Sequence, residues 1–256
     1  MSAIDTLFQE LRQSGRKALM PFVTAGDPDL EFTKDLLRTL DAKGCSLCEL
    51  GIPYSDPIAD GPVIQASYTR ALSAGLRVEQ IFERLGELDP DDTPPLIAMV
   101  SFSIISRRGS KAFVQRAAEA GFSGLIVPDL PGDEAGDLVQ VAGAGGLDLV
   151  PLIAPTTPAS RAEAIIESAR GFLYCISVAG TTGARAALPA ALDTQLAELH
   201  EQTGLPLAVG FGISGPEHVA ALRGKAEGAI VGSALVKRLE RLGDESTDRE
   251  SALEDI

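Results

Sequence analysis

The chain has 256 residues, 45% hydrophobic and 23% charged, so it is long enough to bury an ample core without a metal or disulfide staple. Its 22 basic and 36 acidic residues give a formal net charge of −14. This charge excludes a general nucleic-acid or anionic-membrane surface, because both require a positive field. It does not exclude an anionic small substrate, since backbone N–H groups bind phosphate without a cationic side chain.

Residues 1–17 predict an amphipathic helix rather than a signal peptide. No apolar run reaches the roughly 18 residues of a membrane span. We therefore expect a cytoplasmic protein.

After this helix, short apolar runs alternate with longer amphipathic segments, which is typical of a parallel sheet covered by helices. Amphipathic segments such as 30–44, 110–121, 132–145 and 158–171 end near a glycine, as helices often do. Two of them begin near polar residues, and we expect Ser110 and Asp133 to be N-caps. Strands are expected at residues 19–25, 45–51, 96–102, 124–129, 147–154, 171–178, 206–212 and 228–233.

Eight consecutive βα units without a linker favour a closed (β/α)8 TIM barrel, formed by residues 1–256 as a single domain with an extra N-terminal helix. An open doubly wound sheet is the alternative. Two turn-rich loops, 51–64 and 179–188, follow strands and therefore lie at the end of the barrel where catalytic loops occur. The acidic segment 240–256 is expected to fray.

The three cysteines are Cys45, Cys48 and Cys175. The Cys-x-x-Cys spacing of the first two resembles a redox motif or half of a zinc site, but it lies in an apolar run and no second pair exists. We expect all three to be buried, reduced strand residues.

Two acidic residues are candidates for catalysis. Glu49 lies near the end of the second strand among apolar neighbours, so it should point into the barrel mouth, where desolvation raises a carboxyl pKa into a range useful for proton transfer. An ion-paired glutamate at the rim is the alternative. Asp60 lies in a loop stiffened by prolines, where an aspartate is either catalytic or a turn-former that bonds its own backbone.

The last two strands both end in small residues, Gly210-Phe211-Gly212 and Gly232-Ser233, and each precedes a helix pattern. In barrels the loops after the seventh and eighth strands form the usual phosphate site, although ordinary turn glycines are the alternative reading. Residues 180–183, Gly-Thr-Thr-Gly, predict a lid with glycine hinges over the same phosphate.

The remaining chemistry is restricted by what the strand ends lack. None of the expected strands ends in a lysine, which disfavours a Schiff-base aldolase. The two histidines, His200 and His218, lie outside the expected strand ends and disfavour a histidine-rich metal site, so we expect no metal.

Several segments together resemble the tryptophan synthase alpha subunit family. They run in order along nearly the whole chain, and the block ELGIPYSDPIADGPVIQ is the most specific of them. The matching segments are residues 21–29, 49–67, 124–131, 177–185, 210–214 and 228–237.

The resemblance implies a lyase of L-tryptophan biosynthesis that cleaves indole-3-glycerol phosphate into indole and glyceraldehyde 3-phosphate by a retro-aldol reaction. It implies that Glu49 is the general acid/base, that Asp60 binds the indole N–H and stabilises the indolenine tautomer, and that Tyr174 lies near Glu49. It also implies substrate-binding roles for a larger set: Phe22, Met99, Ile126 and Leu152 as apolar walls, Phe211 beside the indole or phosphate arm, Gly183, Gly212, Gly232 and Ser233 around the phosphate, and Thr182 as a lid residue touching Asp60.

The family works as an α2β2 heterotetramer whose beta subunit holds pyridoxal phosphate, so no cofactor is expected in this chain. Pro53 and Asp56 match positions that face the beta subunit. Ser101 and Ser103 stand where the family usually has Tyr and Asn, which affects the pocket rim and the subunit contact. The position of Arg185, over the phosphate or in solvent, stays open.

Three alternatives remain. One is a stand-alone indole-3-glycerol phosphate lyase that releases free indole. Another is a weakly active regulatory subunit that binds ligand and activates its partner. The third is a different phosphate-binding barrel of the same pathway, which the block from Glu49 to Gln65 disfavours.

Overall fold

The computed structural model describes the chain except residues 59, 178–189, 211, 241–247 and 255. Its strands are β1 (Ala18–Thr24), β2 (Cys48–Gly51), β3 (Leu96–Met99), β4 (Phe122–Ile126), β5 (Asp148–Val150), β6 (Leu152–Ile153), β7 (Leu173–Ile176), β8 (Leu207–Gly210) and β9 (Gly228–Val231). Its helices are α1 (Ala3–Gln13), α2 (Leu30–Ala42), α3 (Pro62–Ser73), α4 (Val78–Leu85), α5 (Phe102–Arg108), α6 (Ser110–Glu119), α7 (Gly136–Ala144), α8 (Ala159–Ser168), α9 (Ala190–Gln202), α10 (Pro216–Ala221), α11 (Ser233–Leu239) and α12 (Arg249–Glu254). The described residues also include two 3-10 turns, η1 (Pro90–Asp92) and η2 (Gly132–Glu134).

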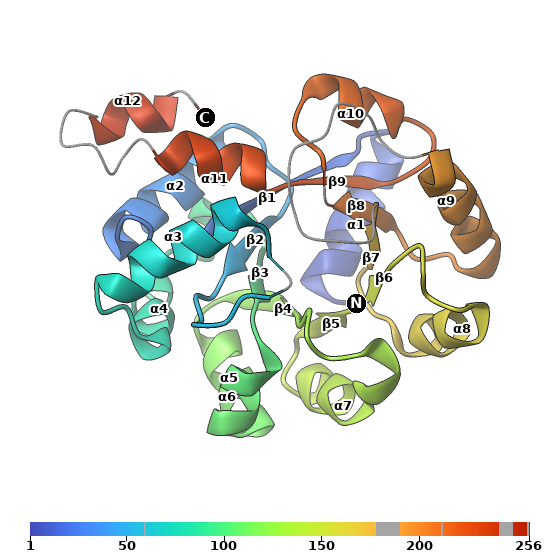
Figure 1. The fold of residues 1–256 in the computed structure, drawn as a ribbon, viewed down its shortest axis with the longest axis horizontal. Coiled ribbons are helices and arrows are strands. Elements are labelled where there is room, and N and C mark those ends of the chain that lie inside the picture. The colour runs from blue at the N-terminus through green and yellow to red at the C-terminus, as the bar shows by residue number, and fades with distance from the viewer. Residues whose placement is uncertain (59, 178–189, 211, 241–247, 255) are drawn as a thin grey trace.

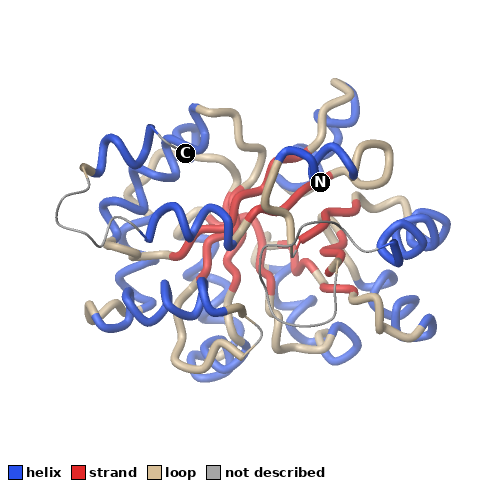
Figure 2. The backbone as a smooth tube through the Cα atoms, turned by 45° about the horizontal axis from the view of Figure 1, so that its top comes forward, coloured by secondary structure: helices blue, strands red, loops and turns tan. Residues whose placement is uncertain are grey.

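The strands form one parallel sheet in the order β5-β4-β3-β2-β1-β9-β8-β7-β6. The two end strands, β5 and β6, are halves of one strand interrupted at Pro151, which has no N–H to donate to a ladder. The Pro151 carbonyl still accepts from Tyr174 N at 3.0 Å, so the sheet closes on itself. The predicted eight-stranded (β/α)8 barrel is confirmed, and the open doubly wound alternative is wrong. Figures 1 and 2 show the strands at the centre and the helices around them.

Alternation of side chains along the strands separates two apolar layers. Inward residues such as Met20, Ile97 and Ile230 form a cluster inside the barrel. Outward residues, for example Leu50 and Leu173, pack under the surrounding helices. The strands are thus covered on both faces along most of their length, with Leu19 of β1 as an exposed exception. An inward position near a strand end faces the barrel mouth.

The predicted N-terminal helix is confirmed as α1, and it closes the end of the barrel where the strands begin. Ile4, Phe8 and Leu11 belong to the interior cluster, and the Phe8 ring lies 5.6 Å from that of Phe172. Ser2 caps the helix by accepting from Asp5 N at 3.1 Å, and its hydroxyl donates to Asp148 at the start of β5. The barrel is therefore open only at the C-terminal ends of its strands.

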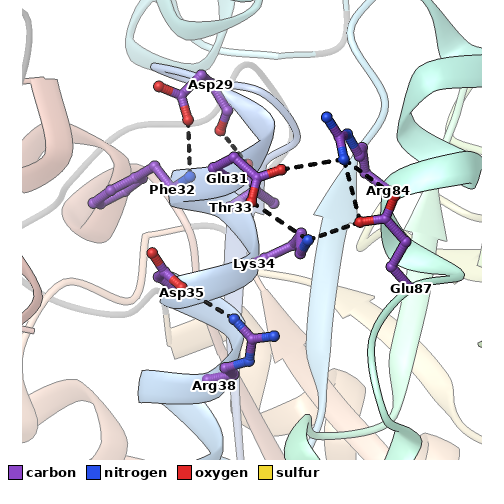
Figure 3. Close-up of polar contacts among 9 residues, drawn as sticks. All are labelled: Asp29, Glu31, Phe32, Thr33, Lys34, Asp35, Arg38, Arg84 and Glu87. Carbon is purple, nitrogen blue, oxygen red and sulfur yellow. Dashed lines mark hydrogen bonds and ion pairs between the residues drawn. The ribbon is translucent and has the colours of Figure 1, made fainter.

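Charged side chains connect the outer helices. Figure 3 shows Lys34 of α2 donating to Glu87 at 2.9 Å, with Glu31 at 3.4 Å, while Arg84 of α4 lies 3.1 Å from Glu87 and 3.7 Å from Glu31. Because Glu31, Arg84 and Glu87 are about half exposed, solvent screens these ion pairs. They add little to stability compared with the apolar layer beneath them.

Two expectations about helix starts and chain ends are wrong. Ser110 is the first residue of α6, whose N-cap is Gly109, and Asp133 lies in η2 ahead of α7. Residues 249–254 of the segment expected to fray form α12. An ion pair of Arg249 with Asp29 and a hydrogen bond from Lys43 to the Glu254 carbonyl attach α12 to the end regions of α2. Contacts across the fold, which local composition does not reveal, decide both cases.

The cysteines are free, as expected. Cys48 and Cys175 are buried on strands, whereas Cys45 lies ahead of β2 and is only half-buried. Among the helices that the structure describes, none combines the length and apolarity needed to cross a bilayer.

We predict that Phe8→Ala destabilises the protein by about 3–5 kcal/mol, because it leaves a cavity between α1 and the barrel interior. Urea denaturation measures this loss. The matched variant Gln9→Ala, on the exposed face of the same helix, should change the free energy of unfolding by less than about 0.5 kcal/mol. Equal effects of the two substitutions would show that α1 does not close the barrel.

Candidate active site

A cavity with about 490 Å³ of empty space, part of it open to solvent, lies at the C-terminal end of the barrel. The loops after β2, β8 and β9 contribute to its wall, as do inward side chains of the strands. Its described lining residues are Phe22, Glu49, Asp60, Ile64, Met99, Tyr174, Gly212, Ile213, Ser214, Ile230, Gly232, Ser233 and Ala234.

Glu49 is fully buried at this cavity. In the sheet it lies in register between Phe22 of β1 and Ile97 of β3, so its flanking neighbours are apolar. Neither carboxyl oxygen has a hydrogen-bond partner among the described residues. Desolvation therefore raises the pKa of Glu49 well above its ordinary value. The structure places this carboxyl inside the mouth, unlike an ion-paired glutamate at the rim.

Asp60 lies where the loop after β2 meets α3, and its side chain is 6% exposed. Its backbone N–H donates to Pro57 O at 3.1 Å, and its carbonyl accepts from Gln65 Nε2 at 2.7 Å. Burial raises the pKa of Asp60 to about 6. The carboxyl is thus less desolvated than that of Glu49, and it is mostly ionised at neutral pH.

Tyr174 projects inward from β7 beside both carboxyls. Burial, together with the charges of Glu49 and Asp60, raises the pKa of its phenol well above the usual value. The phenol is therefore neutral at physiological pH. Gly210 on the neighbouring strand β8 makes room for it, because a Cβ at this position would lie 2.1 Å from Tyr174 Oη.

Small residues form another part of the cavity wall. Gly212 has a φ of +84°, a backbone conformation that residues other than glycine rarely adopt. Gly232 is the N-cap of α11, Ser233 and Ala234 are its first residues, and no side chain caps its N-terminus. No lysine, arginine or histidine is among the described lining residues. An anion here would be bound by N–H and hydroxyl groups, with the helix dipole adding a modest attraction.

The structure brings eight of the predicted site residues to this cavity, and others lie elsewhere. Ile126 is buried in the barrel interior but does not line the cavity. Leu152 lines another cavity, between the loop after β4, β5, α7 and the end of α8. Thr182, Gly183, Arg185 and Phe211 lie outside the described residues.

Five lining residues were missed by the sequence reasoning: Ile64, Ile213, Ser214, Ile230 and Ala234. Ile230 was detectable by strand alternation, because it is the inward residue two positions before Gly232. Ile64 lies one turn into α3, in the same block as Asp60, and helix periodicity from Gly61 would have found it.

A second hollow on the surface lies between the loop after β2 and the start of α5. Pro53 is buried there, whereas Asp56 is exposed and Ile58 is 82% exposed. Ser101 donates to Asp129 at 2.7 Å and lies 2.7 Å from the hydroxyl of Ser103. The two serines that depart from the family pattern thus share one hydrogen-bond network, and both line this hollow.

Fold and cavity together define a (β/α)8 barrel whose mouth brings two desolvated carboxyls and a phenol to one cavity. The tryptophan synthase alpha chain family model matches residues 8–256. Two tryptophan synthase alpha chains are each 48% identical: that of Rhodopirellula baltica over 93% of this chain and 87% of its own length, and that of Synechococcus elongatus over 96% and 92%.

Solved structures that are similar to this chain are also of tryptophan synthase. Tryptophan synthase subunit alpha from Legionella pneumophila superposes with a TM-score of 0.89 at 36% identity, over 100% of this chain and 95% of the other. A structure from Pyrococcus furiosus, described as the tryptophan synthase α2β2 complex, gives 0.83 at 38% identity, over 93% and 94%.

The chain therefore belongs to the tryptophan synthase alpha chain family. The alpha-chain reaction of this family is the cleavage of indole-3-glycerol phosphate to indole and glyceraldehyde 3-phosphate in tryptophan biosynthesis, which makes this chain a carbon–carbon lyase. The reaction uses no cofactor, and pyridoxal phosphate belongs to the beta subunit.

The raised pKa of Asp60 predicts a pH-dependent cost to stability. Since the pKa is about 6 in the fold and near 3.8 when unfolded, the fold disfavours the ionised form. Stability attributable to this group is therefore highest at low pH and falls between pH 4 and 6, by about 3 kcal/mol at about 1.4 kcal/mol per pKa unit. Asp60→Asn should raise the free energy of unfolding at pH 8 and lose this advantage at pH 4.

Urea denaturation at both pH values measures the effect. Because the chain is strongly acidic, removing any negative charge relieves some repulsion, and Asp137→Asn on the exposed side of α7 controls for it. A gain for Asp60→Asn no larger than that for Asp137→Asn would contradict the desolvation of Asp60.

Gly210→Ala tests the space reserved for Tyr174. The added methyl group would displace the phenol from the two carboxyls and should lower both activity and stability, the latter by about 1–3 kcal/mol. Gly143→Ala is the matched control: it lies in α7 with nothing within 4 Å of its added Cβ, and should stabilise the protein by about 0.5–1 kcal/mol. Unchanged indole release in Gly210→Ala would argue against a role for the Tyr174 position.

Proposed function

We propose that Glu49 and Asp60 have different roles in the cleavage of indole-3-glycerol phosphate. Glu49 acts as a neutral acid, and Asp60 provides a negative charge. The observation that carries this proposal is the difference between their environments. Glu49 is fully buried, has no hydrogen-bond partner among the described residues and has the more strongly raised pKa, whereas the pKa of Asp60 is about 6. Near neutral pH, Glu49 then holds a proton while Asp60 is mostly ionised, and such a separation assigns acid and base roles in a site.

The reaction follows from these two states. Neutral Glu49 gives its proton to indole C3, which converts the ring into an indolenine whose N–H carries positive charge. Ionised Asp60 accepts a hydrogen bond from that N–H and stabilises the charge. The Glu49 carboxylate then takes the proton of the C3′ hydroxyl as the C3–C3′ bond breaks. Indole and glyceraldehyde 3-phosphate result, and Glu49 is neutral again.

The other residues bind and orient the substrate. Tyr174 places a neutral phenol beside Glu49, and Phe22 and Met99 provide apolar walls for the indole ring. Gly212, Gly232 and Ser233 surround the phosphate. We extend the substrate-binding proposal to Ile126, Leu152, Thr182, Gly183 and Phe211, as the family resemblance implies.

We also propose that this chain pairs with a beta subunit in an α2β2 complex, as the Pyrococcus furiosus protein does. The supporting feature is the hollow beside Pro53 and Asp56, where the exposed Ile58 offers apolar surface next to the site loop that ends in Asp60. Partner binding there would act on the same loop. We place the working enzyme, residues 1–256 as one domain, in the cytoplasm.

Indole release from indole-3-glycerol phosphate tests these roles. Glu49→Gln should lower kcat by about 10²–10⁴-fold, because it removes proton transfer. Asp60→Asn should lower kcat by about 10²-fold or more, because it removes the negative partner of the ring N–H. Glu163→Gln, an exposed glutamate on α8, is the control and should leave kcat unchanged.

Each variant is measured with and without a beta subunit. Stimulation of the wild type by the partner supports the α2β2 proposal. Full turnover without stimulation would favour a stand-alone lyase. Ser101 and Ser103 are consistent with that alternative, because they replace the Tyr and Asn that the family usually has at the pocket rim and the subunit contact. Activity of Glu49→Gln equal to that of the wild type would refute the proposed mechanism.

A further inference from the structure

Asp27 connects the turn after β1 to α3. Its carboxylate accepts from Arg70 Nε at 3.0 Å and from Arg70 Nη2 at 2.6 Å, and the Ser67 hydroxyl donates to the same group. Asp27 is 9% exposed and Ser67 is fully buried, so solvent competes weakly for these bonds. A bidentate arginine–carboxylate pair of this kind fixes orientation as well as distance.

The helix held in this way leads directly to Asp60. Asp60 is separated from the first residue of α3, Pro62, only by Gly61, which is the N-cap. One turn into the helix, Gln65 Nε2 donates to Asp60 O at 2.7 Å and to Pro57 O at 3.2 Å, which ties the loop to the helix. Ile64 on the same turn lines the cavity. A shift of α3 therefore moves Asp60.

The bridge from Arg70 to Asp27 is better sheltered than the second ion pair of Arg70. That second pair joins Arg70 to Glu240 at the end of α11, which lies 3.5 Å away and is half exposed. That contact is screened by solvent, whereas the contacts to Asp27 are short, paired and mostly sheltered. The turn after β1 therefore adds a directional polar restraint on α3 to the packing of its buried face on β1 and α11.

We propose that Asp27 and Arg70 are positioning residues that hold α3 so that the Asp60 carboxylate meets the indole N–H in the transition state. This inference rests on the role proposed above for Asp60. Neither residue lines the cavity, so their effect on the reaction passes through α3. Because the contact of Asp60 strengthens as charge develops on the ring, its displacement lowers kcat more than it raises KM.

A double-mutant cycle on the full chain tests the proposal. Arg70→Lys keeps the charge but loses the bidentate geometry. It should lower kcat for indole release by about tenfold or more when Asp60 is present, and should have no further effect in the Asp60→Asn background. Arg116→Lys is the matched control. Arg116 donates to Glu79 through Nε and Nη2 at 3.0 and 2.9 Å on the outer helices, and its replacement should leave kcat unchanged in both backgrounds.

The outcomes separate the two proposals. Equal losses of kcat from Arg70→Lys in both backgrounds, or no loss in either, would overturn the positioning role alone. An unchanged kcat in Asp60→Asn by itself would overturn the proposed role of Asp60 and this inference with it. If Arg70→Lys does not fold, as judged by its thermal midpoint, Ser67→Ala removes a single bond of the same bridge and completes the cycle.

Discussion

Dehydration of one carboxyl group is the constraint on which the rest of this structure depends. Glu49 occupies an inward strand position between Phe22 and Ile97, in a layer that would otherwise be apolar. An ionised carboxylate there would be costly, so desolvation raises the pKa of Glu49 well above its ordinary value. The closed barrel supplies the dry surroundings, and α1 seals its far end with Phe8. The desolvation that makes this group unfavourable for folding is also what the proposed mechanism uses, because it favours the protonated form of Glu49.

Binding of the substrate phosphate is also constrained by charge. A chain of net charge −14 must bind a doubly negative group, yet none of the described residues lining the cavity is cationic. In the proposed site, backbone N–H groups beside Gly212, Gly232 and Ser233 would bind the anion locally without a positive field around the molecule.

The barrel, its eight strands and most of the cavity wall could be predicted because they follow from patterns that are local in sequence. Strand alternation places Glu49 inward, and the Pro/Gly-rich loop places Asp60 at a strand end. What the sequence could not predict depends on contacts between distant segments. The helix at 249–254 is attached by Arg249 to Asp29, the fifth strand is divided at Pro151, and α3 is held by Asp27 across 40 residues. Local patterns also predicted too much. Ile126 and Leu152 show that an inward or strand-end position does not guarantee contact with the cavity.

The most direct test of this account is the titration of Glu49 itself, followed by NMR of carboxyl-labelled glutamate with Glu49→Gln assigning the signal. The account predicts that the Glu49 carboxyl stays protonated as pH rises through the range in which exposed glutamates ionise, and loses its proton only well above it. Ionisation of Glu49 together with the exposed glutamates would show that the carboxyl is hydrated, and would contradict both its burial and its role as the acid that protonates indole C3.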